Sequence, residues 1–199
     1  MPSIVYAYGE NIYINLTNAC PCACVFCVRQ KSAGLGSASS LWLEKTPSFE
    51  EVKSALGKWN LADFRQLVFC GYGEPTCALD ILLQTCAHLR KISDVPIRLN
   101  TNGLSDLINE KPTAKLFAGM VDSVSISLNA SNAQEYNELC KPRFGADAFP
   151  AILRFARDCK AYIPYVRLTA VDKIPPQSIA ACREIAEELG LPFRLRHEN

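Results

Sequence analysis

Apolar strand-like runs alternate with amphipathic helical stretches along most of this chain. After a strand at residues 4–8 and a short turn, six further strands are expected, at 12–16, 66–70, 97–101, 123–128, 165–170 and 193–196. Strands and helices that alternate in this way form right-handed parallel units. Six units are too few for a closed eight-fold barrel, which takes about 250 residues. The sequence therefore predicts an α/β fold, an incomplete (β/α)6 partial barrel with an N-terminal β-hairpin strand. An open doubly wound sheet is the alternative.

The helices are expected between these strands. Ser48 and Glu51 have the spacing of a capping box at the start of the first one. Further helices are predicted after residue 76, weakly around 111–118, around 149–159, and at about 177–189. No internal repeat or low-complexity tract suggests a second domain, so residues 1–199 are expected to form one.

Composition narrows the class of protein. Hydrophobic residues make up 49% of the 199 residues and charged residues 21%, which is ordinary for a globular protein. A net charge of +1 gives no broad basic field, so neither nucleic acid nor an anionic membrane is expected as a partner. No apolar run approaches the roughly 20 residues of a membrane helix, and residues 1–10 show no signal peptide. Ten cysteines without an export signal indicate a reducing, cytoplasmic location.

Four of these cysteines lie within eight residues, directly after the predicted strand at 12–16. Cys20, Cys24 and Cys27 have C-x3-C-x2-C spacing. Three thiolates from one loop can hold three irons of a cubane cluster and leave the fourth iron without a protein ligand, whereas an electron-transfer cluster uses four cysteines. An open iron indicates chemistry at the metal, and not electron storage alone.

A zinc site or a closed cluster is the alternative, with Cys22 as the fourth ligand. Structural zinc usually pairs one C-x2-C with a second C-x2-C or with H-x3-5-H. This chain has one C-x2-C pair, and its two histidines, His88 and His197, are far apart. In an extended segment the Cys22 side chain is expected to point away from those of its neighbours, so we interpret it as a non-ligand. The other six cysteines are interpreted as small buried hydrophobes: Cys70, Cys77, Cys86, Cys140, Cys159 and Cys182.

Polar and glycine residues follow the predicted strands, at the edge where ligands bind in such folds. They are Gly71–Pro75 after the strand at 66–70, Thr101–Gly103 after the next, and then Ser127, Asn129, Thr169 and Val171. These residues should gather around one ligand.

The motifs together resemble those of the radical S-adenosylmethionine (radical SAM) superfamily over essentially the whole chain. That family has C-x3-C-x2-C with an aromatic residue before the last cysteine, here Phe26. Gly73-Glu74-Pro75 is similar to its G-G-E-P motif, and Thr101–Gly103 to the turn of its fourth motif. The segments 15–18, 71–76 and 193–196 most resemble the small TatD-associated radical SAM subgroup.

This resemblance implies a [4Fe–4S] cluster on Cys20, Cys24 and Cys27, with S-adenosylmethionine (SAM) chelated to the open iron. An electron donor such as flavodoxin or ferredoxin would reduce the cluster. SAM would then be cleaved to a 5′-deoxyadenosyl radical that abstracts hydrogen from an unidentified substrate. An activase that installs a glycyl radical in a partner protein is an alternative within the enzyme class. A zinc or closed-cluster module is the non-catalytic alternative.

The resemblance also implies SAM contacts near the glycine-rich turn. Gly71 and Gly73 would let the backbone approach the methionine amino group. Glu74 would place negative charge beside the ammonium, or it is a solvated loop acid. Tyr72 replaces the first glycine of G-G-E, which leaves the direction of its side chain open. Asn102 is either a cofactor contact or a turn residue.

Four more residues have paired interpretations. Ser127 and Asn129 would bind the ribose, although turn capping explains Asn129 as well. Arg167 would pair with the SAM carboxylate if it faces the barrel interior, or form an outward salt bridge. Phe26 would stack on adenine or pack beneath the cysteine loop. Val171 would line the adenine pocket.

Two features at the barrel mouth stay open. The long loop at 28–45 is either a lid over the site or a flexible insertion. Arg29, Arg143 and Arg196 could bind an anionic group, although scattered arginines are usually surface charges.

Overall fold

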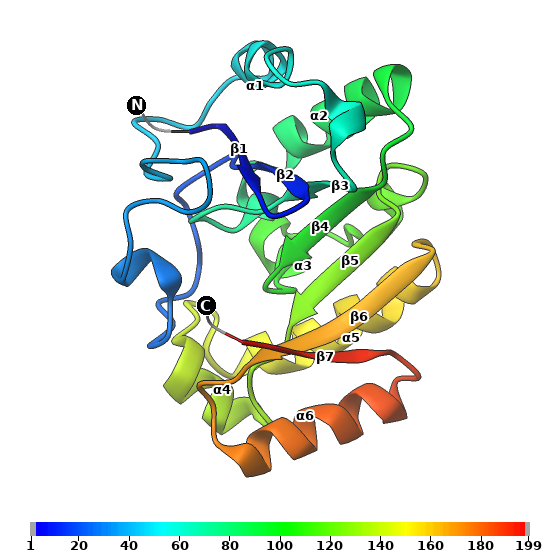
Figure 1. The fold of residues 1–199 in the computed structure, drawn as a ribbon. Helices are drawn as coiled ribbons and strands as arrows, with labels where there is room; N and C mark the ends of the chain where they lie inside the picture. Colours follow the sequence, from blue (N-terminus) through cyan, green and yellow to red (C-terminus); the bar gives the residue numbers. More distant parts are fainter. Residues whose placement is uncertain (1–2, 198–199) are drawn as a thin grey trace.

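The computed structural model describes residues 3–197, which form a curved seven-stranded sheet with helices against one face (Figure 1). The strands lie side by side in chain order. They are β1 (Val5–Tyr8), β2 (Asn11–Ile14), β3 (Gln66–Phe69), β4 (Ile97–Thr101), β5 (Ser123–Ser127), β6 (Tyr165–Val171) and β7 (Phe193–Arg196). β1 pairs antiparallel with β2, and every later neighbour is parallel. The predicted partial barrel with its N-terminal hairpin strand is confirmed. The doubly wound alternative is wrong because the strand order never reverses.

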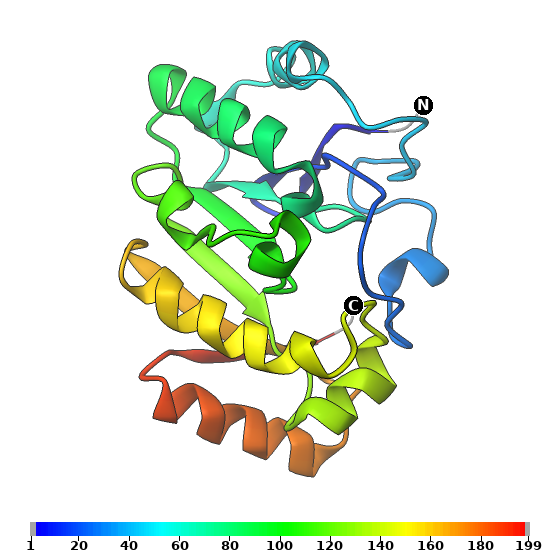
Figure 2. The ribbon, with the colours of Figure 1, turned by 180° about the vertical axis from the view of Figure 1, so that it is seen from behind.

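Helices cover one face of the sheet, as the reverse view in Figure 2 shows. They are α1 (Phe49–Leu56), α2 (Leu79–Ile92), α3 (Ser105–Asn109), α4 (Ala133–Cys140), α5 (Ala148–Lys160) and α6 (Pro176–Glu188). Short 3-10 helices lie between them: η1 (Val28–Gln30), η2 (Leu61–Asp63), η3 (Pro75–Ala78), η4 (Ala114–Phe117) and η5 (Gly145–Asp147).

The capping box that begins α1 is confirmed. The Glu51 N–H donates to Ser48 Oγ, and the Ser48 N–H donates to Glu51 Oε2. The weak helix predicted around 111–118 is only the 3-10 turn η4. The sequence interpretation missed α3 and α4. α3 is a five-residue helix, and α4 has only two buried side chains, Tyr136 and Cys140, so neither has a strong apolar stripe.

The two faces of the sheet differ in chemistry because strand side chains alternate between them. The face toward the helices is apolar, and it includes the fully buried side chains Ile12, Ile14, Leu67, Phe69, Leu99, Val124, Ile126 and Leu168. The opposite, concave face is polar. In register across it lie Asn100, Ser125 and Arg167, followed by Ser127, Thr169 and Arg194. A polar concave face is therefore available for a ligand.

The loop at 28–45 is anchored to the hairpin and to the segment after β2. The Ser37 N–H donates to Ala7 O over 2.9 Å. The side-chain amides of Asn15 and Asn18 donate to Leu41 O and Leu43 O, over 2.8 and 2.6 Å. Leu41 and Leu43 are themselves buried. The flexible-insertion interpretation is therefore wrong for this part of the loop, and its role as a lid stays a prediction.

Burial of the scattered cysteines follows the prediction in part. Cys86, Cys140, Cys159 and Cys182 are buried, whereas Cys70 and Cys77 are partly exposed at the edge where the strands end. Within residues 3–197, no helix has both the length and the apolar character needed to cross a bilayer.

Candidate cluster and cofactor site

The segment that follows β2 carries the four clustered cysteines to the carboxyl edge of the parallel strands. It is held by neighbouring loops: the Ala23 N–H donates to Cys140 O over 3.0 Å, and the Glu74 N–H donates to Ala19 O over 2.8 Å. Residues 19–24 therefore lie between the turn after β3 and the end of α4. The cysteines meet the glycine-rich turn, as the sequence predicted.

Asn102 contacts two of the cysteines. Its side-chain Nδ2 lies 4.0 Å from Cys20 Sγ and 3.8 Å from Cys22 Sγ. Its Oδ1 accepts the Leu104 N–H over 2.9 Å, which closes the turn after β4. Asn102 is therefore a turn residue whose amide also reaches two cysteine sulfurs, and its contact with the cofactor stays a prediction.

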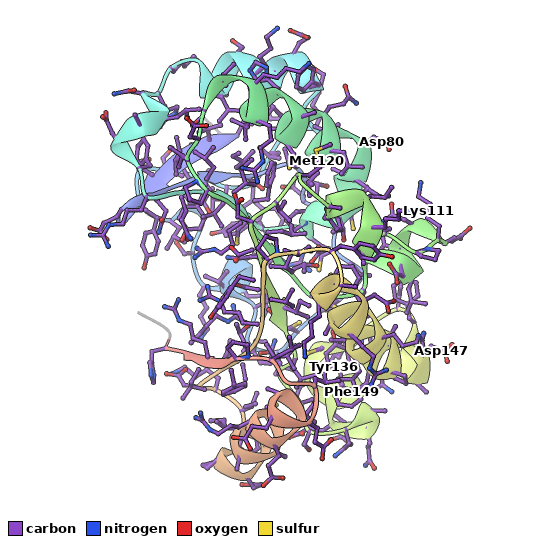
Figure 3. All side chains as sticks on the ribbon, turned by 90° about the vertical axis from the view of Figure 1, so that its right-hand side faces the viewer. Asp80, Lys111, Met120, Tyr136, Asp147 and Phe149 are labelled. Carbon is purple, nitrogen blue, oxygen red and sulfur yellow. The ribbon has the colours of Figure 1, made fainter. Side chains whose placement is uncertain are left out.

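The expectation that Cys22 points away from its neighbours is wrong. Its thiol interacts with those of Cys20 and Cys24, and Asn102 Nδ2 reaches both Cys20 Sγ and Cys22 Sγ. Cys22 is only 4% exposed, and its Sγ lies 3.8 Å from the Tyr136 hydroxyl. Tyr136 comes from α4 and packs beside Phe149 of α5 (Figure 3). Sequence reasoning missed Tyr136 because it missed α4.

Neighbouring groups and burial raise the pKa of two of the cysteine thiols, Cys20 and Cys24. The Cys140 side chain, together with burial, raises the pKa of Cys24, whose Sγ also donates to Cys140 O at 3.7 Å. The contact with Cys22 and burial raise the pKa of Cys20. Both thiols are therefore protonated at neutral pH without a metal, and metal binding would release their protons.

The chemistry of this donor set fits an iron–sulfur cluster, because soft cysteine thiolates select such clusters. The thiols are partly or fully shielded from solvent. Within residues 3–197, no three cysteine, histidine or acidic side chains are gathered closely enough to hold a metal ion.

Glu74 is buried, with 4% of its surface exposed, so the interpretation as a solvated loop acid is wrong. Its Oε1 accepts hydrogen bonds from the Thr76 N–H, the Thr76 hydroxyl and the Thr101 hydroxyl, over 3.1, 2.8 and 2.7 Å. Its Oε2 accepts the Asn102 N–H over 2.7 Å. Burial raises the pKa of Glu74, and these hydrogen bonds oppose that rise. The carboxylate links the ends of β3 and β4 beneath the cysteine loop.

Gly71 and Gly73 permit a close approach between two protein segments. A Cβ on Gly71 would collide with the Asn15 side chain, and one on Gly73 would collide with the carbonyl of Thr17 and lie 2.7 Å from Ala19 O. The structure thus gives these glycines a reason that sequence analysis did not consider. Tyr72 between them is buried and points toward the loop at 28–45, where its hydroxyl donates to Ser32 O.

The other predicted contacts are spread along the carboxyl edge and the concave face. Asn129 has left-handed backbone geometry (φ 58°), and its Oδ1 accepts the Val171 N–H over 3.1 Å, so its side chain ties the segment after β5 to β6. Val171 and Phe26 are partly buried against the core. Ser127 Oγ accepts from Arg196 Nη2 over 3.1 Å.

Arg167 faces the concave side, which rules out the outward salt bridge. Its Nε donates to Ser125 Oγ over 2.7 Å. It lines a pocket of about 240 Å³ in the sheet's concave face. The other lining residues are Tyr8, Tyr13, Arg98, Asn100, Ser125, Ser127, Thr169, Arg194, Arg196 and His197. Most of them were missed, although the alternation of arginine with apolar residues in β4, β6 and β7 was a readable signal.

The three arginines that were expected at the barrel mouth lie in different places. Arg196 lines this pocket, whereas Arg29 donates to Cys22 O over 3.2 Å and Arg143 lies over the Phe144 ring.

Comparison with known proteins identifies the family. Residues 14–189 match the family model described as the Radical SAM superfamily. This chain belongs to the radical SAM superfamily. Its cofactors are accordingly a [4Fe–4S] cluster and SAM. The TatD-associated subgroup stays a prediction.

One relative is similar to this radical SAM chain in sequence, and two solved structures are similar to it in fold. A probable GTP 3′,8-cyclase of Thermococcus kodakarensis is 29% identical over 158 residues, which are 79% of this chain and 46% of that protein. The solved structure of native anSMEcpe with bound AdoMet superposes with a TM-score of 0.63 at 22% identity, over 94% of this chain and 50% of that one. A radical SAM methyltransferase from Sphaerobacter thermophilus gives 0.61 at 14% identity, over 98% and 69%. The chain spans about half the length of the cyclase and of anSMEcpe.

Proposed function

We propose that this protein is a radical SAM enzyme whose cluster is held by Cys20, Cys24 and Cys27. The single observation that carries the proposal is the placement of the cysteine segment against the turn after β3, where the Glu74 N–H donates to Ala19 O. This contact supports a single site made from two motifs that are far apart in the sequence.

The chain's own residues have distinct tasks in this proposal. The reduced cluster, when bound, supplies the electron that cleaves SAM to methionine and a 5′-deoxyadenosyl radical, which abstracts hydrogen from a substrate. Asn102 Nδ2 is positioned to donate to cysteine sulfur, a contact that tunes the potential of an iron–sulfur centre. Glu74 acts as a positioning residue, since its two carboxylate oxygens already accept protein donors.

The polar concave face offers the binding surface. Backbone and hydroxyl groups at the ends of β5 and β6, including Ser127 and Thr169, are within the pocket and can bind polar groups of SAM or substrate. Asn129 and Val171 hold the same edge together through their mutual hydrogen bond. The predicted adenine contact of Phe26 belongs to the proposal as well, as do a flavodoxin or ferredoxin as electron donor and a cytoplasmic location.

Anaerobic reconstitution with iron and sulfide tests the proposal. The loaded protein should show the absorbance and EPR spectrum of a [4Fe–4S] cluster, and dithionite with SAM should yield 5′-deoxyadenosine and methionine. A fully loaded cluster that never cleaves SAM would reject the enzyme. Zinc bound without iron or labile sulfide would favour the non-catalytic module.

A further inference from the structure

Four arginines converge on the concave pocket, and none is paired with an acid among residues 3–197. They are Arg98 from β4, Arg167 from β6, and Arg194 and Arg196 from β7. No aspartate or glutamate of the described chain lines this pocket. Two arginines elsewhere do have acidic partners: Arg65 pairs with Glu10 and Arg90 with Asp122. The pocket therefore carries an uncompensated positive charge.

Neutral side chains hold three of these four guanidinium groups in place. Arg98 Nη1 donates to Gln66 Oε1 over 2.6 Å, Arg167 Nε to Ser125 Oγ, and Arg196 Nη2 to Ser127 Oγ. Each arginine thus keeps its charge and several N–H donors available for a ligand. Arg98 Nε is buried without a hydrogen-bond partner in the protein, which costs stability unless a ligand satisfies it.

The arginines are close enough to repel one another. Burial, and then the charges of Arg98 and Arg194, lower the pKa of Arg167. Burial also lowers the pKa of Arg196, and Arg194 adds to that effect. Collecting like charges on one face costs free energy, and a bound anion would relieve that cost.

SAM itself does not account for this charge. It carries one carboxylate, one ammonium and one sulfonium, so its net charge is positive. One guanidinium is enough for a single carboxylate, because the fork geometry binds it bidentately. Four guanidiniums in one pocket would repel the rest of SAM, so the surplus points to a second ligand of the opposite sign.

We propose that this pocket binds the phosphoryl or diphosphoryl group of a small anionic substrate. A diphosphoryl group carries more charge than a dicarboxylate and matches four guanidiniums more closely. The hydroxyls of Ser125 and Ser127 accept from Arg167 and Arg196, so their own hydrogens can be donated to phosphate oxygens. At about 240 Å³ the pocket is smaller than the roughly 300–1,000 Å³ of a drug-sized ligand site, so it fits a charged group and not a macromolecule. The assignment of this group to a substrate rests on the proposed function.

Isothermal titration calorimetry of the full chain with inorganic pyrophosphate tests the proposal at low ionic strength. Pyrophosphate should bind the wild type, and R98Q or R167Q should weaken binding by about tenfold or more, the cost of losing a charge-assisted hydrogen bond. R154Q, on the exposed side of α5, is the matched control and should bind as the wild type does. R194Q provides a variant that cannot disturb the core, because Arg194 is exposed, and it should also weaken binding.

Three outcomes would overturn the proposal. The first is that the wild type does not bind pyrophosphate. The second is that folded R98Q, R167Q and R194Q bind pyrophosphate as tightly as the wild type does. The third is that the wild type binds succinate more tightly than pyrophosphate. Competition by SAM in the cluster-loaded protein would assign the pocket to SAM and reject the proposal too. C24A, which should lack the cluster, should still bind pyrophosphate. Failure of SAM cleavage with binding intact would therefore reject the proposed function and leave the anion site standing.

Discussion

The backbone N–H of Asn102 donates to Oε2 of Glu74 over 2.7 Å, so a buried carboxylate joins the ends of β3 and β4. The other oxygen of the same carboxylate accepts from Thr76 and Thr101. Asn102 in turn directs its side-chain amide at the sulfurs of Cys20 and Cys22. The acidic residue of the glycine-rich turn therefore reaches the cysteines through Asn102.

Glu74→Gln should destabilise the protein, although the glutamine side chain has nearly the same shape as the glutamate side chain. The glutamine amide nitrogen cannot accept the Asn102 N–H or the threonine donors, so at least one buried donor is left unpaired, at a cost of about 1–3 kcal/mol. Urea unfolding of the cluster-free protein measures this cost. Glu44→Gln, at an exposed position of the loop, is the control and should be neutral. Equal stability of E74Q and wild type would contradict the link.

Gly73→Ala should displace the cysteine segment. The new Cβ would meet backbone carbonyls of Thr17 and Ala19, which cannot rotate away, and overpacking of this kind costs about 1–3 kcal/mol. We expect lower unfolding free energy and less iron bound on reconstitution. Gly57→Ala is the matched control, since its Cβ would lie 3.6 Å from the nearest atom and its φ is −62°. If both variants behave alike, steric contact does not explain Gly73.

Features that depend on local sequence were predictable, and features that depend on contacts between distant residues were not. Strand positions were predictable because the apolar alternation that buries Ile12, Ile14 and Leu67 is local in the chain. The direction of Cys22 was not, because it depends on a turn and on Tyr136, more than a hundred residues away. Likewise, the Glu74 contacts come from Thr101 and Asn102 on another strand. Long-range contacts decided the details of the site, while local patterns decided the fold.

Acid should remove the stabilising effect of Glu51. Its hydrogen bond with the Ser48 backbone, and then the contact with Lys45, lower its pKa from 4.5 to about 2. A depressed folded-state pKa means that the stabilisation is present above pH 4.5 and is lost as pH falls toward 2. The difference in urea midpoint between wild type and E51Q should therefore shrink from pH 7 to pH 2. E50Q, one residue earlier on the same helix, lacks the Ser48 contact and should show a smaller difference at pH 7. A constant gap between wild type and E51Q at all pH values would contradict the assignment.

Substitution of single cysteines should decide which of them bind the cluster. Cys20→Ala, Cys24→Ala and Cys27→Ala should each abolish the iron, the labile sulfide and the visible absorbance of the reconstituted protein, because three thiolates are the minimum for the site. Cys22→Ala should retain all three, although its sulfur lies beside those of Cys20 and Cys24. Its contacts with Tyr136 and Asn102 give it a packing role, so a modest loss of stability is expected. Cys86→Ala, in the core of α2, controls for the loss of a buried thiol. Loss of iron from C22A with retention in C27A would reassign the ligands to Cys20, Cys22 and Cys24.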